Sequence, residues 1–536
     1  MRIAVLQCEL SHLHTPPHIG PSLIVQELEA RGHQVRRFFV HVTRLEELAS
    51  ELRAAEIELC AIDSIFPLDV VRRWKERLGA TPVVVGGLNA LPLFEQAPLE
   101  FAILGPARAA MAALAEALDA AGGSNPNLES VPNLLFRRAP SSLSSRIEAS
   151  GTTHAWSLER EILPYAPPLE WEYRGPSGRH PMADRLGVSI LPEFGCPYQS
   201  RAPLPPQCAD DGVTLRPAAY DDRAWQRVRE IYLDDVAACT FCVFRYQPFD
   251  PTPTASAVET LMEQVSYLWP LGVRSFAIQS ENPFRFVEPL LDAMRRRGWK
   301  PEEIRLRTMV SVLKAQETRV EEVLRCTAAA GVRVSITQVG FESFVDRTLA
   351  LFHKGVTSHE NRRIARFLRR LDRAADGRIR TVHGHGLILF DPWTTLEELE
   401  TNLEAIEADA PFLKRAVNLD AKLYLYSPYT PIARVVRAAG LLTRSDYEFG
   451  YDFDYADPDL PIFRDLCARG FAPLLEAIGR RRLEPQVRRR LSIEGRFRWF
   501  RELAGHIRAQ RANRADPERG WSPVLAEVIR GLGLEG

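Results

Sequence analysis

Apolar runs alternate with helical repeats along the first 120 residues of the chain. The runs predict five strands, at residues 2–7, 34–40, 59–64, 82–85 and 101–104. Residues 21–31 and 45–55, which lie between them, have helical periodicity. Such alternation is typical of a doubly wound parallel sheet, which binds ligands at the carboxyl ends of its strands. We therefore expect the binding edge at residues 7–20, 64–68, 86–90 and 105–108.

A second alternation of strands and helices begins near residue 185. Its six predicted strands are 188–194, 273–279, 304–310, 332–340, 379–389 and 418–426. Six β/α units in series favour a partial (β/α)6 barrel. The expected class is α/β, with a Rossmann-like domain at 1–135, a turn-rich connector at 136–184, a barrel at 185–435 and a charged helical region at 436–536.

Charge and hydropathy narrow the classes of function. The chain carries 68 basic and 69 acidic side chains, a net charge of -1, which predicts no general attraction to nucleic acid. No apolar run reaches about 18 residues, so no membrane span is expected. The amino terminus is typical of a first strand rather than a signal peptide, and the expected location is the cytoplasm.

Four of the eight cysteines lie within one stretch of 47 residues, at Cys196, Cys208, Cys239 and Cys242. The other four stand singly in apolar or helical surroundings and are expected to be core thiols. Cys239 and Cys242 form a C-x-x-C pair, which bends one loop so that two thiolates face one metal. Zinc sites and redox pairs share this spacing, so the pair alone leaves the metal open.

The segment GCPY after the first barrel strand, followed by CTFC, resembles the radical S-adenosylmethionine (SAM) superfamily. The resemblance implies that Cys196, Cys239 and Cys242 bind three irons of a [4Fe–4S] cluster, and that SAM binds the fourth. Tyr198 and Phe241 match the aromatic positions of these two segments. One departure is large, because the family's C-x3-C spacing is replaced by 42 residues, 197 through 238.

We interpret this gap as an insertion in the cluster loop, at about residues 200–238. Cys208 lies inside it and is an alternative to Cys196, or a fourth ligand that would block the open iron. A loop that holds no catalytic cluster is the remaining alternative.

Two further strand ends resemble the same superfamily. Ser280, Glu281 and Asn282 stand where relatives hold the amino group of SAM, although capping side chains would give the same pattern. Gly340–Ser343, followed by KGVT, resembles the G-x-E-S and K-G-x-T elements of the subgroup that also has a cobalamin domain. Glu342 is expected to face the barrel mouth, where a buried carboxylate needs a partner. Arg307 is the predicted partner or a substrate ligand; a purely structural pair is the alternative.

The fifth barrel segment suggests a proton donor and a helix start. His383 and His385 share one side of the strand, and His385 is a candidate proton donor or a wall residue. Thr395 is expected to cap the next helix, with Glu398 completing a capping box. Tyr426, Tyr429 and Thr430 in the last segment are expected to line the substrate mouth.

The amino-terminal domain resembles cobalamin-binding Rossmann modules. Residues 82–90 match their VVxGGxxA segment, which implies cofactor contacts from Gly86, Gly87 and Asn89, and Ser64 matches their usual serine. The D-x-H-x-x-G signature is missing, and GPAR at 105–108 stands where GEGE is common. The alternative is a Rossmann domain that has lost its cofactor.

Together these resemblances imply an enzyme that cleaves SAM reductively, and that uses cobalamin to methylate or modify a small molecule or peptide. An external electron donor such as flavodoxin or ferredoxin would supply the electron. The alternatives are a radical SAM enzyme without cobalamin, a non-catalytic paralogue that acts as a binding protein, and a zinc-site protein.

Overall fold

The computed structural model describes the chain except for residues 10–18, 88–89, 123–124, 139–144, 153–170, 176–187, 194–195, 197, 199–218, 233–237, 243–252, 375–376, 382–384, 420, 426–429, 444–451, 482, 514 and 535–536. The predictions for Asn89, Cys208, His383, Tyr426 and Tyr429 therefore lie outside the described residues. The chain divides into two compact units. The first is Met1–Arg305, Tyr424–Val435 and Thr443–Asp452, and the second is Leu306–Leu423, Val436–Leu442 and Phe453–Gly536.

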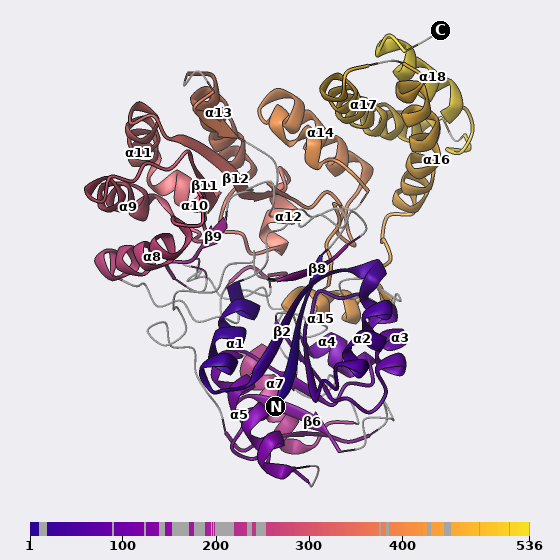
Figure 1. The fold of residues 1–536 in the computed structure, drawn as a ribbon. Helices are drawn as coiled ribbons and strands as arrows, with labels where there is room; N and C mark the ends of the chain where they lie inside the picture. The colour runs from indigo at the N-terminus through magenta and orange to yellow at the C-terminus, as the bar shows by residue number, and fades with distance from the viewer. Residues whose placement is uncertain are drawn as a thin grey trace. The chain divides into compact units, whose positions relative to one another are not determined.

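An eight-stranded sheet organises the first unit (Figure 1), with strand order β7-β6-β5-β4-β3-β1-β2-β8. Its strands are β1 (Arg2–Glu9), β2 (Gln34–His41), β3 (Leu59–Asp63), β4 (Val83–Gly86), β5 (Phe101–Ile103), β6 (Leu134–Arg137), β7 (Ile147–Ala149) and β8 (Glu172–Arg174). Strands β1 to β5 are parallel, which confirms the predicted doubly wound sheet. The order of β2, β1 and β3 places the topological switch point between β1 and β3, where such sheets bind ligands.

Helices cover both faces of this sheet because β1 is apolar on both sides. Ile3 and Val5 pack in one core with α1 (Ile19–Ala30) and α5 (Arg108–Ala121). Leu6 and Cys8 pack in the other core with α2 (Leu45–Ala54), α3 (Leu68–Leu78) and α4 (Ala90–Gln96). Figure 1 shows α1 and α5 on one side of the strands and α2 and α3 on the other. A short 3-10 helix, η1 (Val42–Arg44), precedes α2.

Two segments expected to lie outside the Rossmann-like sheet contribute to it. Strands β7 and β8 come from the predicted connector, and β8 pairs in parallel with β2. Helix α7 (Asp222–Tyr232) comes from the predicted insertion, and its Trp225 and Val228 pack in the core that contains α2 and α3. The Tyr220 hydroxyl, two residues before α7, donates to Glu95 at 2.6 Å. The insertion is thus partly built into the first unit.

A second sheet has the strand order β13-β12-β11-β10-β9, with β14 beside β12. The strands are β9 (Val188–Ile190), β10 (Ser275–Ile278), β11 (Glu303–Met309), β12 (Arg333–Glu342), β13 (Ile379–Thr381) and β14 (Gly386–Leu387). The helices among them are α8 (Thr254–Leu268), α9 (Phe284–Arg296), α10 (Val310–Ala315), α11 (Glu317–Ala329), α12 (Asp346–Leu351), α13 (Ser358–Ala374) and α14 (Leu396–Ala408). The strand predicted at 418–426 is not continuous, because among its described residues only Lys422, which bridges Phe390, and Leu425 have β-bridge geometry.

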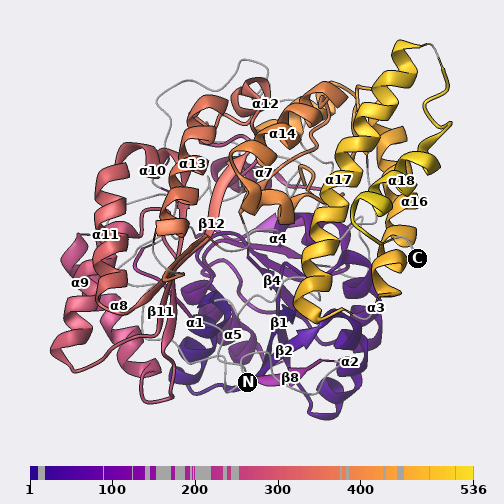
Figure 2. The same ribbon diagram turned by 90° about the horizontal axis from the view of Figure 1, so that it is seen from above.

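The carboxyl-terminal region is helical, as expected. The remaining elements are η6 (Pro411–Ala416), α15 (Pro431–Ala438), β15 (Leu442–Thr443), β16 (Asp452–Phe453), α16 (Asp459–Gly479), α17 (Pro485–Ala512) and α18 (Trp521–Gly531). Helices α16, α17 and α18 pack side by side (Figure 2). The Trp499 indole of α17 donates to the Cys467 carbonyl of α16 at 3.2 Å, and a Cβ at Gly470 would lie 2.6 Å from that ring. Within the described part of the chain, no helix is both long and apolar enough to cross a membrane.

Candidate functional site

The C-x-x-C pair forms one turn in the first unit. The Cys242 N–H donates to the Cys239 carbonyl at 3.3 Å, and the intervening Thr240 carbonyl accepts from the Ile432 N–H at 3.2 Å. The start of α15 therefore supports the cysteine turn. Cys239 is buried and Cys242 is half-buried. Cys196 is also half-buried and follows the end of β9 in sequence.

The described residues contain no group of three or more His, Cys, Asp and Glu side chains that could hold a metal ion. A [4Fe–4S] cluster makes a different demand, because each of its cysteines binds a different iron and the sulfur atoms lie further apart. The donor set of thiols suits iron. The joint action of Cys196, Cys239 and Cys242 remains a prediction, as does the role of the half-buried Tyr198 and Phe241.

A buried carboxylate, Glu193, joins the carboxyl ends of β9 and β10. Its side chain is 2% exposed, and it accepts from the Ser280 hydroxyl at 2.6 Å and from Arg285 Nη2 at 2.7 Å. Burial raises the pKa of Glu193, although the bonds from Ser280 and Arg285 oppose that rise. Glu193 stands three residues before Cys196, so it anchors the start of the cysteine loop. The sequence analysis missed it, although an acidic residue in the apolar run LPEFG was a signal.

The three residues predicted to hold the amino group of SAM differ in the burial and hydrogen bonding of their side chains. The Ser280 hydroxyl already donates to Glu193 and accepts from the Asn282 N–H at 3.0 Å. Glu281 is half-buried. The side-chain oxygen of Asn282 is buried and accepts no hydrogen bond within the described ranges. Asn282 therefore has a buried acceptor that could bind a ligand.

Glu342, at the end of β12 in the second unit, pairs with Lys354 rather than with Arg307. Lys354 Nζ lies 2.9 Å from Glu342 Oε1, and both side chains are nearly buried. The expected pairing with Arg307 is wrong, because the chain returns after α12 and brings the lysine of its KGVT turn to the carboxylate. Arg307 is half-buried on β11. Glu342 has a φ of 62°, in the left-handed region that costs a non-glycine residue about 1–3 kcal/mol.

Two glycines make room for the Glu342 carboxylate. A Cβ at Gly340 would lie 2.6 Å from Oε1, and one at Gly386, on the paired strand β14, would lie 2.9 Å from Oε2. Real Cβ atoms do not approach oxygen so closely, so a side chain at either position would displace the carboxylate. This contact gives a physical reason for the first glycine of the G-x-E-S element.

Two buried asparagines hold the backbone on either side of Glu342. Asn361 of α13 donates from Nδ2 to the carbonyls of Phe341 and Ser343, at 2.8 and 2.6 Å. Asn402 of α14 accepts at Oδ1 from the Ser343 hydroxyl at 3.2 Å and from the Phe344 N–H at 2.6 Å. These bonds fix the strained conformation, and sequence reasoning found neither asparagine.

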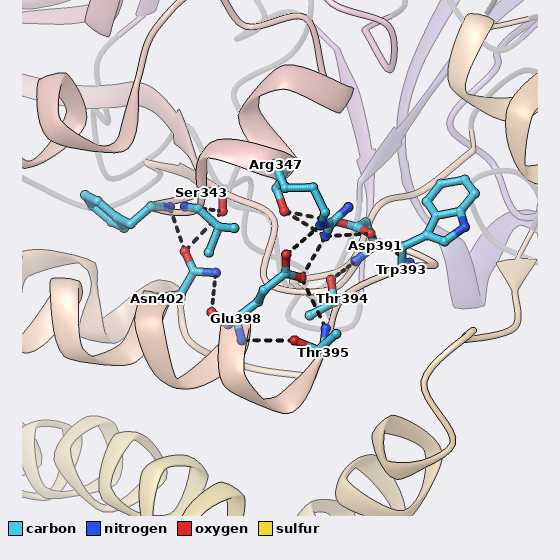
Figure 3. Close-up of polar contacts among 11 residues, drawn as sticks. Ser343, Arg347, Asp391, Trp393, Thr394, Thr395, Glu398 and Asn402 are labelled. Carbon is cyan, nitrogen blue, oxygen red and sulfur yellow. Dashed lines mark hydrogen bonds and ion pairs between the residues drawn. The ribbon is translucent and has the colours of Figure 1, made fainter. Parts of the chain in front are cut away.

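A charged network lies beside this strand end (Figure 3). Arg347 of α12 donates to Asp391, which is 1% exposed, and to Glu398 on the first turn of α14. Burial alone would lower the pKa of Arg347, but Glu398 and Asp391 outweigh it and raise that pKa. Thr395 and Glu398 form the predicted capping box, which is confirmed. The network thus ties α12 to the start of α14.

His385 is buried among aromatic rings. Its Nδ1 accepts from the Val339 N–H at 3.1 Å, so the proton of the neutral ring is on Nε2. The ring lies edge-on to Phe412, with centroids 5.1 Å apart, and to Phe341. This environment suits a wall residue, and the catalytic role of His385 remains a prediction. Thr430 is buried at the start of α15.

Three of the four predicted cobalamin residues, Ser64, Gly86 and Gly87, lie at the carboxyl ends of β3 and β4. The Ser64 N–H donates to the Gly86 carbonyl at 2.9 Å. Gly87 has a φ of 104°, and a Cβ there would lie 2.7 Å from Ser64 Oγ, so only glycine fits. A Cβ at Gly86 would meet nothing within 4 Å. This edge combines a close backbone approach with open space, which suits a ligand beside the switch point.

Neither a protein-family model nor a curated protein matches the chain. Solved structures do match. The radical enzyme OxsB, described with aqua-cobalamin and SAM bound, is 13% identical with a TM-score of 0.62, over 99% of this chain and 75% of OxsB. The radical SAM methyltransferase TsrM from Kitasatospora setae is 18% identical with a TM-score of 0.52, over 82% of this chain and 76% of TsrM. The chain therefore has the fold of the cobalamin-dependent radical SAM enzymes.

Proposed function

We propose that the protein is a cobalamin-dependent radical SAM enzyme that acts on a small molecule or peptide. The observation that carries the proposal is the likeness to OxsB, which extends over 99% of this chain and joins a Rossmann-like sheet to a second β/α sheet. Solved structures of that protein and of TsrM are described with cobalamin, SAM or a [4Fe–4S] cluster bound. C-methylation is the reaction that we favour.

The cluster is assigned to Cys196, Cys239 and Cys242. When bound, it would supply the electron that cleaves the C–S bond of SAM, and flavodoxin or ferredoxin would provide that electron. The protein's own part is to position. Glu193 holds the end of β9 against β10, next to the cysteine loop, and the α15 backbone supports the C-x-x-C turn. Asn282 Oδ1 is a buried acceptor and is assigned to the SAM amino group.

Cobalamin is assigned to the first sheet, with contacts from Ser64, Gly86, Gly87 and Asn89. The tight fit of Gly87 against Ser64 and the space at Gly86 support this assignment. When bound, the cofactor would supply a methyl group for transfer. In the second unit, Glu342 is held at the end of β12 by its ion pair with Lys354. Arg307 and His385 are assigned to the substrate side.

The test is anaerobic reconstitution of the full chain with iron and sulfide, followed by an assay of SAM cleavage under a strong reductant. We expect about four irons per chain and formation of 5′-deoxyadenosine. The double variant Cys239→Ala/Cys242→Ala should lose both. The variant Cys326→Ala is the matched control, because that thiol is exposed on α11 and takes no part in the proposed site. A wild-type chain that binds no iron and cleaves no SAM would overturn the proposal.

Cobalt analysis distinguishes the proposed cobalamin-dependent enzyme from a radical SAM enzyme that does not use cobalamin. Protein reconstituted with hydroxocobalamin and then desalted should retain about one cobalt per chain. Cleavage of SAM without retained cobalt would instead support a radical SAM enzyme that does not use cobalamin.

A further inference from the structure

The side chain of Gln7 has a buried oxygen acceptor that no described residue bonds. This residue of β1 is 1% exposed, and its Oε1 is buried without a hydrogen-bond partner among the residues that the structure describes. A buried acceptor left in this state costs about 1–3 kcal/mol relative to one that is bonded. An apolar side chain of similar size at this position would avoid that cost.

A second buried glutamine shows what a structural amide looks like in this chain. Gln264 of α8 is also 1% exposed, and it bonds at both ends to one residue. Its Oε1 accepts from the Leu191 N–H at 2.9 Å, and its Nε2 donates to the Leu191 carbonyl at 2.9 Å. Gln264 therefore replaces ladder bonds at the end of β9, whereas Gln7 Oε1 accepts no such bond from any described residue.

Gln7 lies near the carboxyl-terminal edge of the sheet, where ligands are expected to bind. It lies two residues before the end of β1, which borders the switch point between β1 and β3. Side chains alternate along a strand, so Gln7 shares the face of Ile3 and Val5, and it pairs in register with Phe39 of the same core. Ser64 and Gly86 mark the carboxyl ends of β3 and β4 on the other side of the switch point.

We propose that Gln7 Oε1 accepts a hydrogen bond from an N–H or O–H group of the corrinoid that binds this edge. The inference rests on the proposed function and adds to it a cofactor contact that no motif indicated. The chemistry fits, because a corrinoid carries amide N–H groups around its ring and hydroxyl groups on its nucleotide tail. The contact also gives Gln7 Oε1 a donor that the described residues do not supply.

The test compares cofactor affinity with the stability of the apo chain. Hydroxocobalamin is titrated into the full-length apo protein, and binding is followed by absorbance and by tryptophan fluorescence. The variant Gln7→Met is close in shape, and Gln7→Leu checks the result with a second apolar side chain. We expect both to bind hydroxocobalamin about three- to tenfold more weakly than the wild type, while the apo Tm stays equal or rises.

The control is Gln264→Met, which should lower the apo Tm and leave the affinity of the folded protein unchanged. Cobinamide, which lacks the nucleotide tail, locates the partner group. An equal loss of affinity for cobinamide and hydroxocobalamin places that group on the corrin ring, and a loss for hydroxocobalamin alone places it on the tail.

Two results would overturn the inference while the proposed function stands. One is wild-type affinity in both Gln7 variants, and the other is a fall of several degrees in their apo Tm, which would make the amide structural. Failure of the wild-type chain to bind hydroxocobalamin would instead overturn cobalamin as the cofactor, and this inference with it.

Discussion

In the second unit, the polar groups around Glu342 are bonded mainly to one another. The carboxylate pairs with Lys354, and Asn361 and Asn402 bond the backbone on either side. In the first unit, two buried acceptors, Gln7 Oε1 and Asn282 Oδ1, have no hydrogen-bond partner within the described residues. Both lie at or near the carboxyl ends of parallel strands, and the candidate cysteine Cys196 follows β9 in sequence.

The difference separates two uses of a polar side chain. A buried group that is bonded within the protein stabilises the fold, and its loss should lower stability. A buried group left open lowers stability unless a ligand completes it, and its loss should weaken binding instead. In the second unit, the bonded kind is clearest at Glu342, although Asn361 Oδ1, Thr381 Oγ1 and Asn418 Oδ1 are buried there without a partner among the described residues. In the first unit, the two acceptors assigned to cofactors, Gln7 Oε1 and Asn282 Oδ1, are of the kind left open for a ligand.

The largest expected effect comes from the ligand choice in the cysteine loop. Cys196→Ala should abolish iron binding and reduce SAM cleavage below detection, because a cluster with two protein thiols is not retained. Cys208→Ala is the matched control and should keep both. The measurements are iron content and 5′-deoxyadenosine formation. The opposite pattern would make Cys208 the ligand.

Removal of the lysine that neutralises Glu342 should have the next largest effect. Lys354→Met leaves a buried charge without its partner and should destabilise the second unit by about 3–5 kcal/mol. The urea midpoint of unfolding measures this loss. The double variant Glu342→Gln/Lys354→Met removes the unpaired charge and should recover part of it. An unchanged midpoint in Lys354→Met would show that the pair does not stabilise this strand end.

Removal of one asparagine beside Glu342 should have a smaller effect. Asn402→Ala leaves the buried N–H of Phe344 without its acceptor, and a loss of about 1–3 kcal/mol is expected. Asn513→Ala, at the exposed end of α17, is the control and should be neutral. Equal Tm values for these two variants would contradict the role that we give to Asn402.

The smallest expected effect is a pH dependence at Glu193. Burial raises the pKa of this carboxyl above its ordinary value of 4.5, so the folded protein keeps a proton that the unfolded chain has lost. The contribution of Glu193 to stability should therefore fall as the pH rises from 4.5 through the raised pKa, and then level off. Glu193→Gln removes this titration. The Tm of the wild type relative to this variant should fall over that window, and a constant difference would contradict this pH dependence.

Much of the fold was predictable because its signals are local. Strands β1 to β5 of the first sheet, helices α1 and α2 and the Thr395 capping box follow from periodicity and short-range bonding. Strands β6, β7 and β8 were missed because segments of three or four residues are too short to show a period. Lys354 and Asn402 were missed as partners because contacts between distant segments, and bonds from a side chain to the backbone, leave no mark in the sequence. Glu193 was visible as an acidic residue in an apolar run.

Electron paramagnetic resonance of the reconstituted and reduced protein, with and without SAM, tests directly whether the chain holds a cluster that binds SAM. We expect the signal of a reduced [4Fe–4S] cluster that changes in shape when SAM is added, because SAM would bind the iron that no cysteine holds. A protein without this signal, or with a signal that SAM leaves unchanged, would contradict the account.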